Sequence, residues 1–183
     1  PIGGQSMLAR IYETVSSITN ETSFVVGYEK EAIIKETKKF VGEINICVQE
    51  KPIGTADAVK AALCNISPDS QTLILYGDVP LIKLQTLKKM LSANEDSLTI
   101  LTTELTDPTG YGRVKKDDAG LALSIVEEKD ATSEEKKIKE IFTGVLCCKK
   151  TLLEEAISQV DNHNAAGEYY LTDIVSIISA KGY

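Results

Sequence analysis

The feature that most constrains the fold is a regular alternation of helix-like and strand-like segments along residues 5–102. Apolar residues recur at helical spacing in segments 5–18, 29–40, 55–66 and 81–91. Short apolar or β-branched runs stand between and after these segments, at 23–27, 44–48, 73–76 and 98–102. Such alternation predicts parallel strands joined by right-handed crossovers, with helices on both faces of the sheet.

After residue 106 the pattern changes. Segments 112–116 and 121–128 flank the turn sequence Asp-Asp-Ala-Gly at 117–120, which predicts an added β-hairpin. The remaining expected elements are a charged helix from about Ser133, a strand at 143–148, and helices at 152–160 and 173–178. No linker or internal repeat divides the sequence, so its 183 residues are predicted to form a single domain, 1–183.

Charge and cysteine content argue against several classes of function. Lys and Arg number 20 against 27 Asp and Glu, a net charge of −7, which is the wrong sign for a nucleic-acid partner. The apolar runs are far shorter than the ~20 residues of a membrane span, so no membrane partner is expected. Four cysteines without Cys-x-x-Cys spacing, and a single histidine, His163, indicate neither zinc nor a disulfide framework and favour a reducing cytoplasm.

Asp78 directly follows the apolar strand expected at 73–76, in the run Tyr76-Gly77-Asp78-Val79-Pro80. Ligands of open α/β sheets gather at the carboxyl ends of the strands. A carboxylate at this place could hold Mg²⁺ against a phosphate. A residue that caps the next helix or closes a turn is the alternative, and the run by itself leaves both interpretations open.

A second polar segment, 49–58, joins a strand end to a helix start. Thr55 is placed to cap this helix, whose free N–H groups could receive a phosphate or carbonyl oxygen. Gln49 carries both a donor and an acceptor, the pairing needed to read a pyrimidine edge. A capped helix with a flexible lead-in is the plainer interpretation of the segment.

Glycine and polar residues also stand beside other expected strand and helix ends, in segments 107–114, 125–132 and 167–173. In the first of these, Gly110 and Gly112 bracket Tyr111, and a glycine backbone beside a sugar ring can bind its hydroxyls. The other segments bring Glu127 to a strand end and Tyr170 to the entry of the last helix. Each segment alone is also typical of a turn or a solvated surface.

Taken in order, these segments resemble those of one family. The runs that carry the resemblance are Leu75-Tyr76-Gly77-Asp78-Val79-Pro80-Leu81, Asp107 to Val114, Val126 to Thr132 and Gly167 to Asp173. Together they are similar to the uridylyltransferase domain of bacterial N-acetylglucosamine-1-phosphate uridylyltransferase, over nearly the whole chain. The resemblance implies a Rossmann-like α/β nucleotidyltransferase fold, with a mostly parallel sheet, helices on both faces and an added β-hairpin region.

The resemblance also implies a reaction. Uridylyl would pass from UTP to N-acetylglucosamine 1-phosphate, giving pyrophosphate and UDP-N-acetylglucosamine for cell-wall peptidoglycan, with Mg²⁺ as cofactor. The sugar phosphate is already an anionic nucleophile. In-line attack at the α-phosphorus therefore needs positioning and charge neutralisation more than a general base.

Particular residues receive roles from the same resemblance. The implied nucleotide-binding residues are Gln49, Gly54, Thr55, Tyr76, Gly77 and Asp78. Of these, Asp78 is implied to be both the metal ligand and the catalytic residue. The implied sugar-binding residues are Gly112, Glu127, Tyr170 and Thr172.

The match begins downstream of the family's opening strand and glycine-rich basic phosphate loop, and ends before a second metal ligand and a C-terminal β-helix domain. The domain is therefore expected to be a truncated one, with little turnover by itself. Phe142 stands where the family usually has asparagine, and Pro52 and Asp57 depart from its uracil loop. Two alternatives stay open: a related sugar-1-phosphate nucleotidyltransferase of other specificity, and a non-catalytic nucleotide-sugar-binding module.

Overall fold

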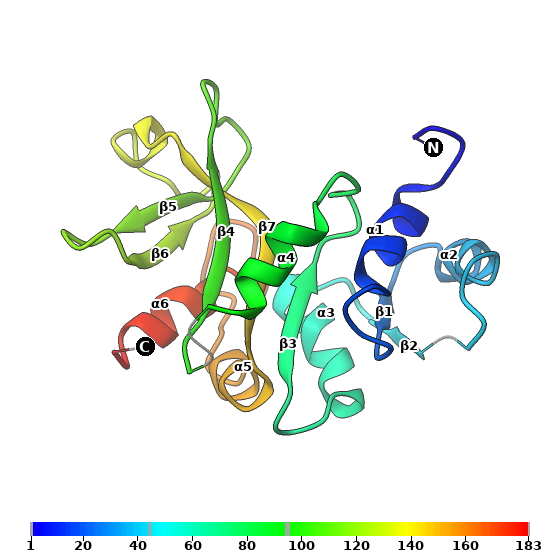
Figure 1. Cartoon of the computed structure of the whole chain (residues 1–183). Helices are drawn as coiled ribbons and strands as arrows, with labels where there is room; N and C mark the ends of the chain where they lie inside the picture. The colour runs from blue at the N-terminus through cyan, green and yellow to red at the C-terminus, as the bar shows by residue number, and fades with distance from the viewer. Residues whose placement is uncertain (1, 44, 94–95, 183) are drawn as a thin grey trace.

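The computed structural model describes residues 2–43, 45–93 and 96–182 and shows an α/β architecture (Figure 1). Its α-helices are α1 (Met7–Val15), α2 (Lys30–Thr37), α3 (Thr55–Ala62), α4 (Leu84–Leu91), α5 (Lys150–Ile157) and α6 (Asp173–Ser179). Its strands are β1 (Ser23–Val26), β2 (Asn45–Val48), β3 (Gln71–Leu75), β4 (Thr99–Glu104), β5 (Arg113–Lys116), β6 (Ala122–Val126) and β7 (Glu140–Lys149). Within the described ranges, no helix has the length and apolar character needed to cross a membrane.

Local sequence explains how the helices begin and which face they bury. At the start of α1, the Ser6 hydroxyl accepts a hydrogen bond from the backbone N–H of Ala9 at 3.3 Å, as an N-cap residue does. Ile11 and Val15 follow one helical turn apart and are both buried. Leu87 of α4 is likewise completely buried. The apolar stripes of the sequence therefore become the inner faces of these helices, as the helical spacing predicts.

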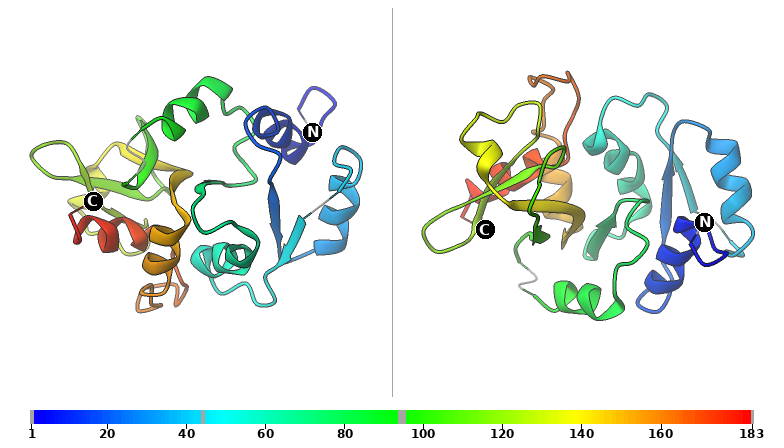
Figure 2. Two further views of the ribbon diagram at one scale, coloured as in Figure 1. Left: turned by 60° about the horizontal axis from the view of Figure 1, so that its bottom comes forward. Right: turned by 90° about the horizontal axis from the view of Figure 1, so that it is seen from above.

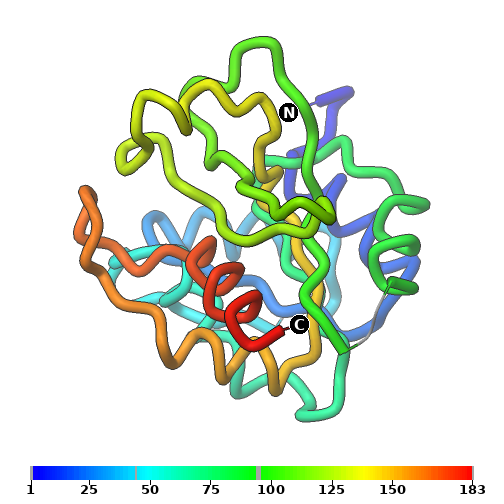
Figure 3. Tube along the Cα trace, turned by 90° about the vertical axis from the view of Figure 1, so that its left-hand side faces the viewer, coloured from blue at the N-terminus to red at the C-terminus, as the bar shows by residue number. Residues whose placement is uncertain are grey.

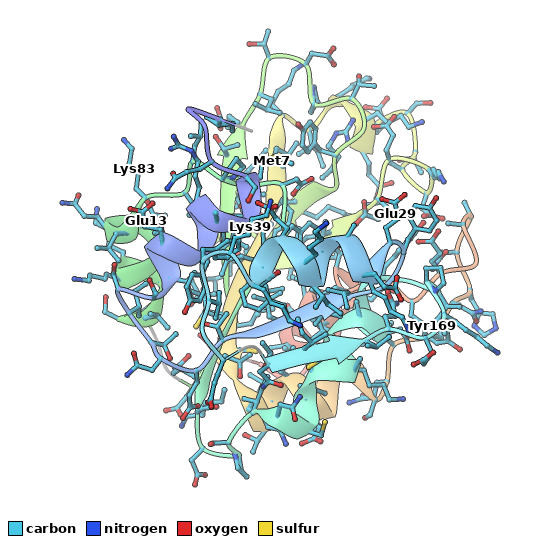
Figure 4. The ribbon with its side chains drawn as sticks, turned by 90° about the vertical axis from the view of Figure 1, so that its right-hand side faces the viewer. Met7, Glu13, Glu29, Lys39, Lys83 and Tyr169 are labelled. Carbon is cyan, nitrogen blue, oxygen red and sulfur yellow. The ribbon has the colours of Figure 1, made fainter. Side chains whose placement is uncertain are left out.

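The first part of the chain forms a small parallel sheet. β1 pairs with β2 in a register that runs from Ser23 opposite Asn45 to Val26 opposite Val48. Figure 4 looks onto this side of the molecule, where α2 and α3 accompany the two strands. This is the parallel strand–helix–strand arrangement that the alternation predicts.

The larger sheet has five strands with β7 at its centre. β7 pairs antiparallel with β3 on one edge and with β4 on the other, and the β5–β6 hairpin continues from it (Figures 1 and 3). The expectation of a mostly parallel sheet is therefore met only by β1 and β2. The ten-residue β7 returns between β3 and β4, and its pairings with β3, β4 and β5 are all antiparallel, as is the β5–β6 hairpin. The periodicity of a segment shows that it is a strand but not which strands become its neighbours.

The charged helix expected from about Ser133 is also different, because only the short 3-10 turn Glu135–Lys137 forms there. The Glu135 carboxylate lies 2.8 Å from Nζ of Lys115 on β5 and accepts hydrogen bonds from both the N–H and the hydroxyl of Thr132. The pair with Lys115 ties the segment to the hairpin, while the bonds with Thr132 close the short turn itself.

Two clusters of buried apolar side chains cover opposite faces of the larger sheet. Neighbouring residues of a strand point to opposite faces. Cys147 accordingly packs in the cluster that contains residues of α1 and α4, whereas Cys148 packs in the cluster that contains residues of α5 and α6. Leu153 and Ile174 of the second cluster have no exposed surface. Figure 2 shows helices on both sides of the strands, as the fold class predicts.

Candidate functional site

Tyr76 lies at the centre of the candidate site, directly after the last residue of β3. Its ring packs against Gly144 of β7, where a Cβ would lie only 2.6 Å from Cδ2 of the tyrosine. Gly144 also has a φ of +81°, which favours glycine. On another side, the ring of Phe142 meets Tyr76 nearly edge-on, with ring centroids 6.3 Å apart. The strand β7 therefore fixes the position of the Tyr76 ring.

The phenol of Tyr76 brings the predicted nucleotide and sugar residues together. Burial raises the pKa of Tyr76, hydrogen bonding with Thr55 lowers it, and the negative charges of Glu127 and Asp78 raise it further. Thr55 belongs to the predicted nucleotide set and Glu127 to the predicted sugar set. The phenol thus interacts with Thr55 directly and with the charges of Glu127 and Asp78 through space.

Asp78 is exposed in the turn that follows β3. It does not cap α4, because that helix begins at Leu84 with Lys83 in the N-cap position. In the parts of the chain that the structure describes, no group of three or more His, Cys, Asp or Glu side chains is placed to hold a metal ion. An exposed carboxylate nevertheless suits Mg²⁺, which usually takes one or two protein carboxylates and completes its shell with phosphate oxygens and water.

Gln49, just after β2, uses both hydrogens of its amide within the protein. Its Nε2 donates to the carbonyl oxygen of Gly54 at 2.9 Å and to Oδ2 of Asp57 at 3.0 Å. An amide NH₂ has two hydrogens to donate. The side chain therefore offers a ligand only its Oε1, and not the donor and acceptor together that the sequence suggests.

The expectation that Thr55 caps its helix is wrong. Gly54 occupies the N-cap position of α3, and Thr55 is the first helical residue. The hydroxyl oxygen of Thr55 instead accepts a hydrogen bond of 2.9 Å from the backbone N–H of Leu171, 116 residues away. A long-range partner thus takes the oxygen that the sequence assigns to the local helix start.

This bond belongs to a contact between residues 53–56 and residues 169–171, which we call the loop contact. The Tyr169 N–H donates to the carbonyl oxygen of Ile53, and the Ala56 N–H donates to the carbonyl oxygen of Tyr169, both at 2.9 Å. Gly54 lies between these bonds with a φ of +137°, and a Cβ on it would come within 2.3 Å of the Tyr169 oxygen. Tyr169, whose N–H and carbonyl oxygen make these two bonds, is labelled in Figure 4. The loop contact joins the predicted nucleotide segment to the segment that carries Tyr170 and Thr172.

The predicted sugar residues also lie together. Thr172 is almost fully buried, and its hydroxyl donates to Oε1 of Glu127 at 2.8 Å. A Cβ on Gly112 would lie 3.4 Å from both carboxylate oxygens of Glu127 and 2.7 Å from Cγ2 of Ile125. Burial raises the pKa of the half-exposed Tyr170, and Glu127 is among the carboxylates that add to this shift. Glu127 is therefore the residue around which the predicted sugar set gathers.

One ion pair beside this set, between a buried arginine and a partly exposed glutamate, is not identified by the sequence analysis. Nη2 of Arg113 lies 2.6 Å from Oε2 of Glu128, and Nη1 of Arg113 donates to the carbonyl oxygen of Tyr111. The pair joins the residues that directly follow Gly112 and Glu127, so it ties the start of β5 to the end of β6. Opposite charges at the outer ends of the predicted hairpin are the signal from which it could have been inferred.

A cavity of about 410 Å³ opens beside Glu127 and Tyr170 and is lined by residues of α6 and of the segment before it. Asp173, the first residue of α6, lines this cavity. Its burial raises its pKa to about 6, with further contributions from the nearby carboxylates of Asp161, Glu127 and Asp130. The ionised form of Asp173 is thus disfavoured in the folded protein.

This shift predicts a stability effect that depends on pH. The unfolded carboxyl titrates near 3.8, so between about pH 4 and pH 6 the folded state binds more protons than the unfolded state. Asp173 therefore lowers stability as the pH rises through this window, and Asp173→Asn should be more stable than the wild type at pH 7. Urea unfolding at several pH values should show this difference shrinking to nothing at low pH, whereas Asp69→Asn, in an exposed loop, should follow the wild type. Parallel curves for Asp173→Asn and wild type would contradict the expectation.

The fold is that of an α/β protein with polar residues just beyond the end of β3, and the carboxyl ends of strands are where open α/β sheets bind their ligands. A family model described as "Nucleotidyl transferase" matches residues 1–183, and the chain belongs to this family. It is 39% identical over 182 residues to "Bifunctional protein GlmU" of Dechloromonas aromatica (strain RCB). The matched region covers 100% of this chain and 40% of the relative. It is 42% identical to the protein of the same name from Neisseria meningitidis serogroup C (strain 053442), with 99% and 39% covered. The chain therefore spans about two fifths of the length of these curated relatives.

Solved structures confirm the fold class. The chain is similar to UDP-glucose pyrophosphorylase complexed with UDP-glucose, with a TM-score of 0.75, 14% identity, and coverage of 100% of this chain and 78% of that one. It is also similar to HddC from Yersinia pseudotuberculosis complexed with GMP-PN, with a TM-score of 0.67, 21% identity, and coverage of 94% and 72%. The α/β nucleotidyltransferase fold implied by the sequence resemblance is thereby confirmed.

Proposed function

We propose that this chain is the part of a sugar nucleotidyltransferase that holds UTP and N-acetylglucosamine 1-phosphate for uridylyl transfer. The observation that carries the proposal is the loop contact, which joins the Gln49–Thr55 segment to the segment of Tyr170 and Thr172. The family and the relatives of about 40% identity support the same assignment. The order of the matching motifs in the sequence favours uracil and N-acetylglucosamine as the base and the sugar.

In this proposal, the chain's residues mainly bind and orient. Gln49 and Gly54 receive the uracil, while Gly112 and Glu127 hold the sugar hydroxyls. A phosphate oxygen of the sugar phosphate forms the new bond to the α-phosphorus, and the bond from that phosphorus to the pyrophosphate oxygen breaks. Asp78 would hold Mg²⁺, which supplies neutralisation of the phosphate charges when it is bound. The nucleophile carries its own negative charge, so no side chain has to remove a proton.

A related transferase with another sugar has one observation in its favour, the position of Phe142. This ring is buried edge-on to Tyr76, and the N–H of the same residue donates to the carbonyl oxygen of Gly112 at 3.0 Å. An aromatic side chain without a polar atom thus stands beside the predicted sugar residues. A substrate with a less polar group facing Phe142 would suit this arrangement.

Calorimetric titration of the chain with UDP-N-acetylglucosamine, UDP-glucose and UDP in the presence of Mg²⁺ tests these proposals. Tighter binding of UDP-N-acetylglucosamine than of the other two supports the proposed substrate. Equal or tighter binding of UDP-glucose favours the related transferase, and binding of none of them contradicts both. The chain alone is expected to turn over little, so pyrophosphate release from UTP and N-acetylglucosamine 1-phosphate is measured with the family's phosphate loop restored upstream of it, and release there separates an enzyme from a binding module. We also propose that the product is a precursor for cell-wall synthesis and that the protein acts in the cytoplasm.

A further inference from the structure

The amide of Gln49 is held in one orientation by two acceptors. The carbonyl oxygen of Gly54 and the carboxylate of Asp57 both receive hydrogen bonds from its Nε2. A carbonyl oxygen and a carboxylate oxygen have no hydrogen to donate in return. Turning the amide by half a turn would set its Oε1 against both oxygens and lose both bonds. The structure therefore fixes which end of the amide faces inward.

The other end of the amide, Oε1, is left open. No residue in the described part of the chain donates a hydrogen bond to it. It lies beside Gly27, where a Cβ would come 3.7 Å from this oxygen. The backbone of Gln49 is anchored as well, because its N–H donates to the carbonyl oxygen of Val26 at 2.8 Å. An anchored residue thus presents a single acceptor next to a position without a side chain.

We propose that Asp57 is a specificity-determining positioning residue, which acts through Gln49 to select a base that carries a ring N–H. This inference rests on the proposed function, in which Gln49 meets the base. N3 of uracil bears a hydrogen that can bind Oε1, whereas N3 of cytosine bears a lone pair that Oε1 repels. Without Asp57, the amide could turn and offer Nε2 to cytosine. Asp57 therefore favours uracil over cytosine without touching either base.

The test compares the affinities of the chain for UDP and CDP by calorimetry. In Asp57→Ala, the preference for UDP over CDP should fall about tenfold, the value of one hydrogen bond of ordinary strength. Asp57→Asn should keep the preference within about threefold, because its Oδ1 still accepts from Nε2 of Gln49. Asp69→Ala removes the same charge from an exposed loop and should keep the preference unchanged.

The possible outcomes separate this inference from the proposed function. An unchanged preference in folded Asp57→Ala, or an equal loss in Asp57→Asn, overturns the role of Asp57 and leaves the proposed function standing. A wild-type chain that binds UDP and CDP equally contradicts the proposed uracil site itself. Thermal melting shows which variants fold. If Asp57→Ala does not, Asp57→Ser keeps a polar residue at the helix start but is too short to reach Gln49, and it should show the same loss of preference.

Discussion

Replacing Gly54 with alanine should lower the free energy of unfolding by about 3 kcal/mol, because its backbone conformation is nearly exclusive to glycine and its Cβ position is occupied. At a φ of +137°, the new methyl group would come within 2.3 Å of the Tyr169 oxygen. Relief of that clash must break the hydrogen bonds of the loop contact. Binding of UDP-N-acetylglucosamine should weaken at least about tenfold, because those bonds hold both substrate segments.

Gly120→Ala is the matched control for this prediction. Gly120 has a φ of +84° in the turn between β5 and β6, and nothing lies within 4 Å of the position of its Cβ. This change should cost about 1 kcal/mol from backbone strain alone and leave ligand affinity unchanged. Urea unfolding and calorimetry of both variants make the comparison. If the two variants were equally stable and bound the ligand equally, the loop contact would have no part in the site.

Much of the order of elements follows from the sequence. The alternation over residues 5–102 and the turn at 117–120 predict helices α1 to α4, the β1–β2 pair and the β5–β6 hairpin, because periodicity and turn residues are local properties. The place of β7 between β3 and β4 could not be predicted in this way. It depends on which edges meet in space, and the strand pattern of residues 143–148 is the same for either direction of pairing.

Among the site residues, too, those marked by a local sequence pattern could be predicted, and those that depend on contacts in the folded chain could not. Asp78 could be singled out because it follows an expected strand, and Glu127 because it stands at the end of one; the negative charges of both raise the pKa of Tyr76. The partners of Gln49 and Thr55 could not, since Asp57 stands in what the sequence shows only as a helix start and Leu171 lies 116 residues further on. Side-chain hydrogen bonds across such separations depend on the folded geometry and leave no periodic pattern in the sequence.

With the family's phosphate loop restored upstream, Asp78→Asn should lower pyrophosphate release about 100-fold, because an amide keeps the size of the carboxylate but loses the charge that attracts a divalent cation. Asp78 is exposed, so the free energy of unfolding should change by less than about 0.5 kcal/mol. A second measurement does not depend on turnover: Mg²⁺ should strengthen UTP binding by the wild type and have no such effect on the variant.

Asp118→Asn, in the exposed turn of the β5–β6 hairpin, removes an equal charge far from β3 in the sequence and should behave as the wild type in both assays. If Mg²⁺ strengthened UTP binding equally in Asp78→Asn and Asp118→Asn, the metal would have to be held without this carboxylate, and the end of β3 would lose its assigned part in the chemistry.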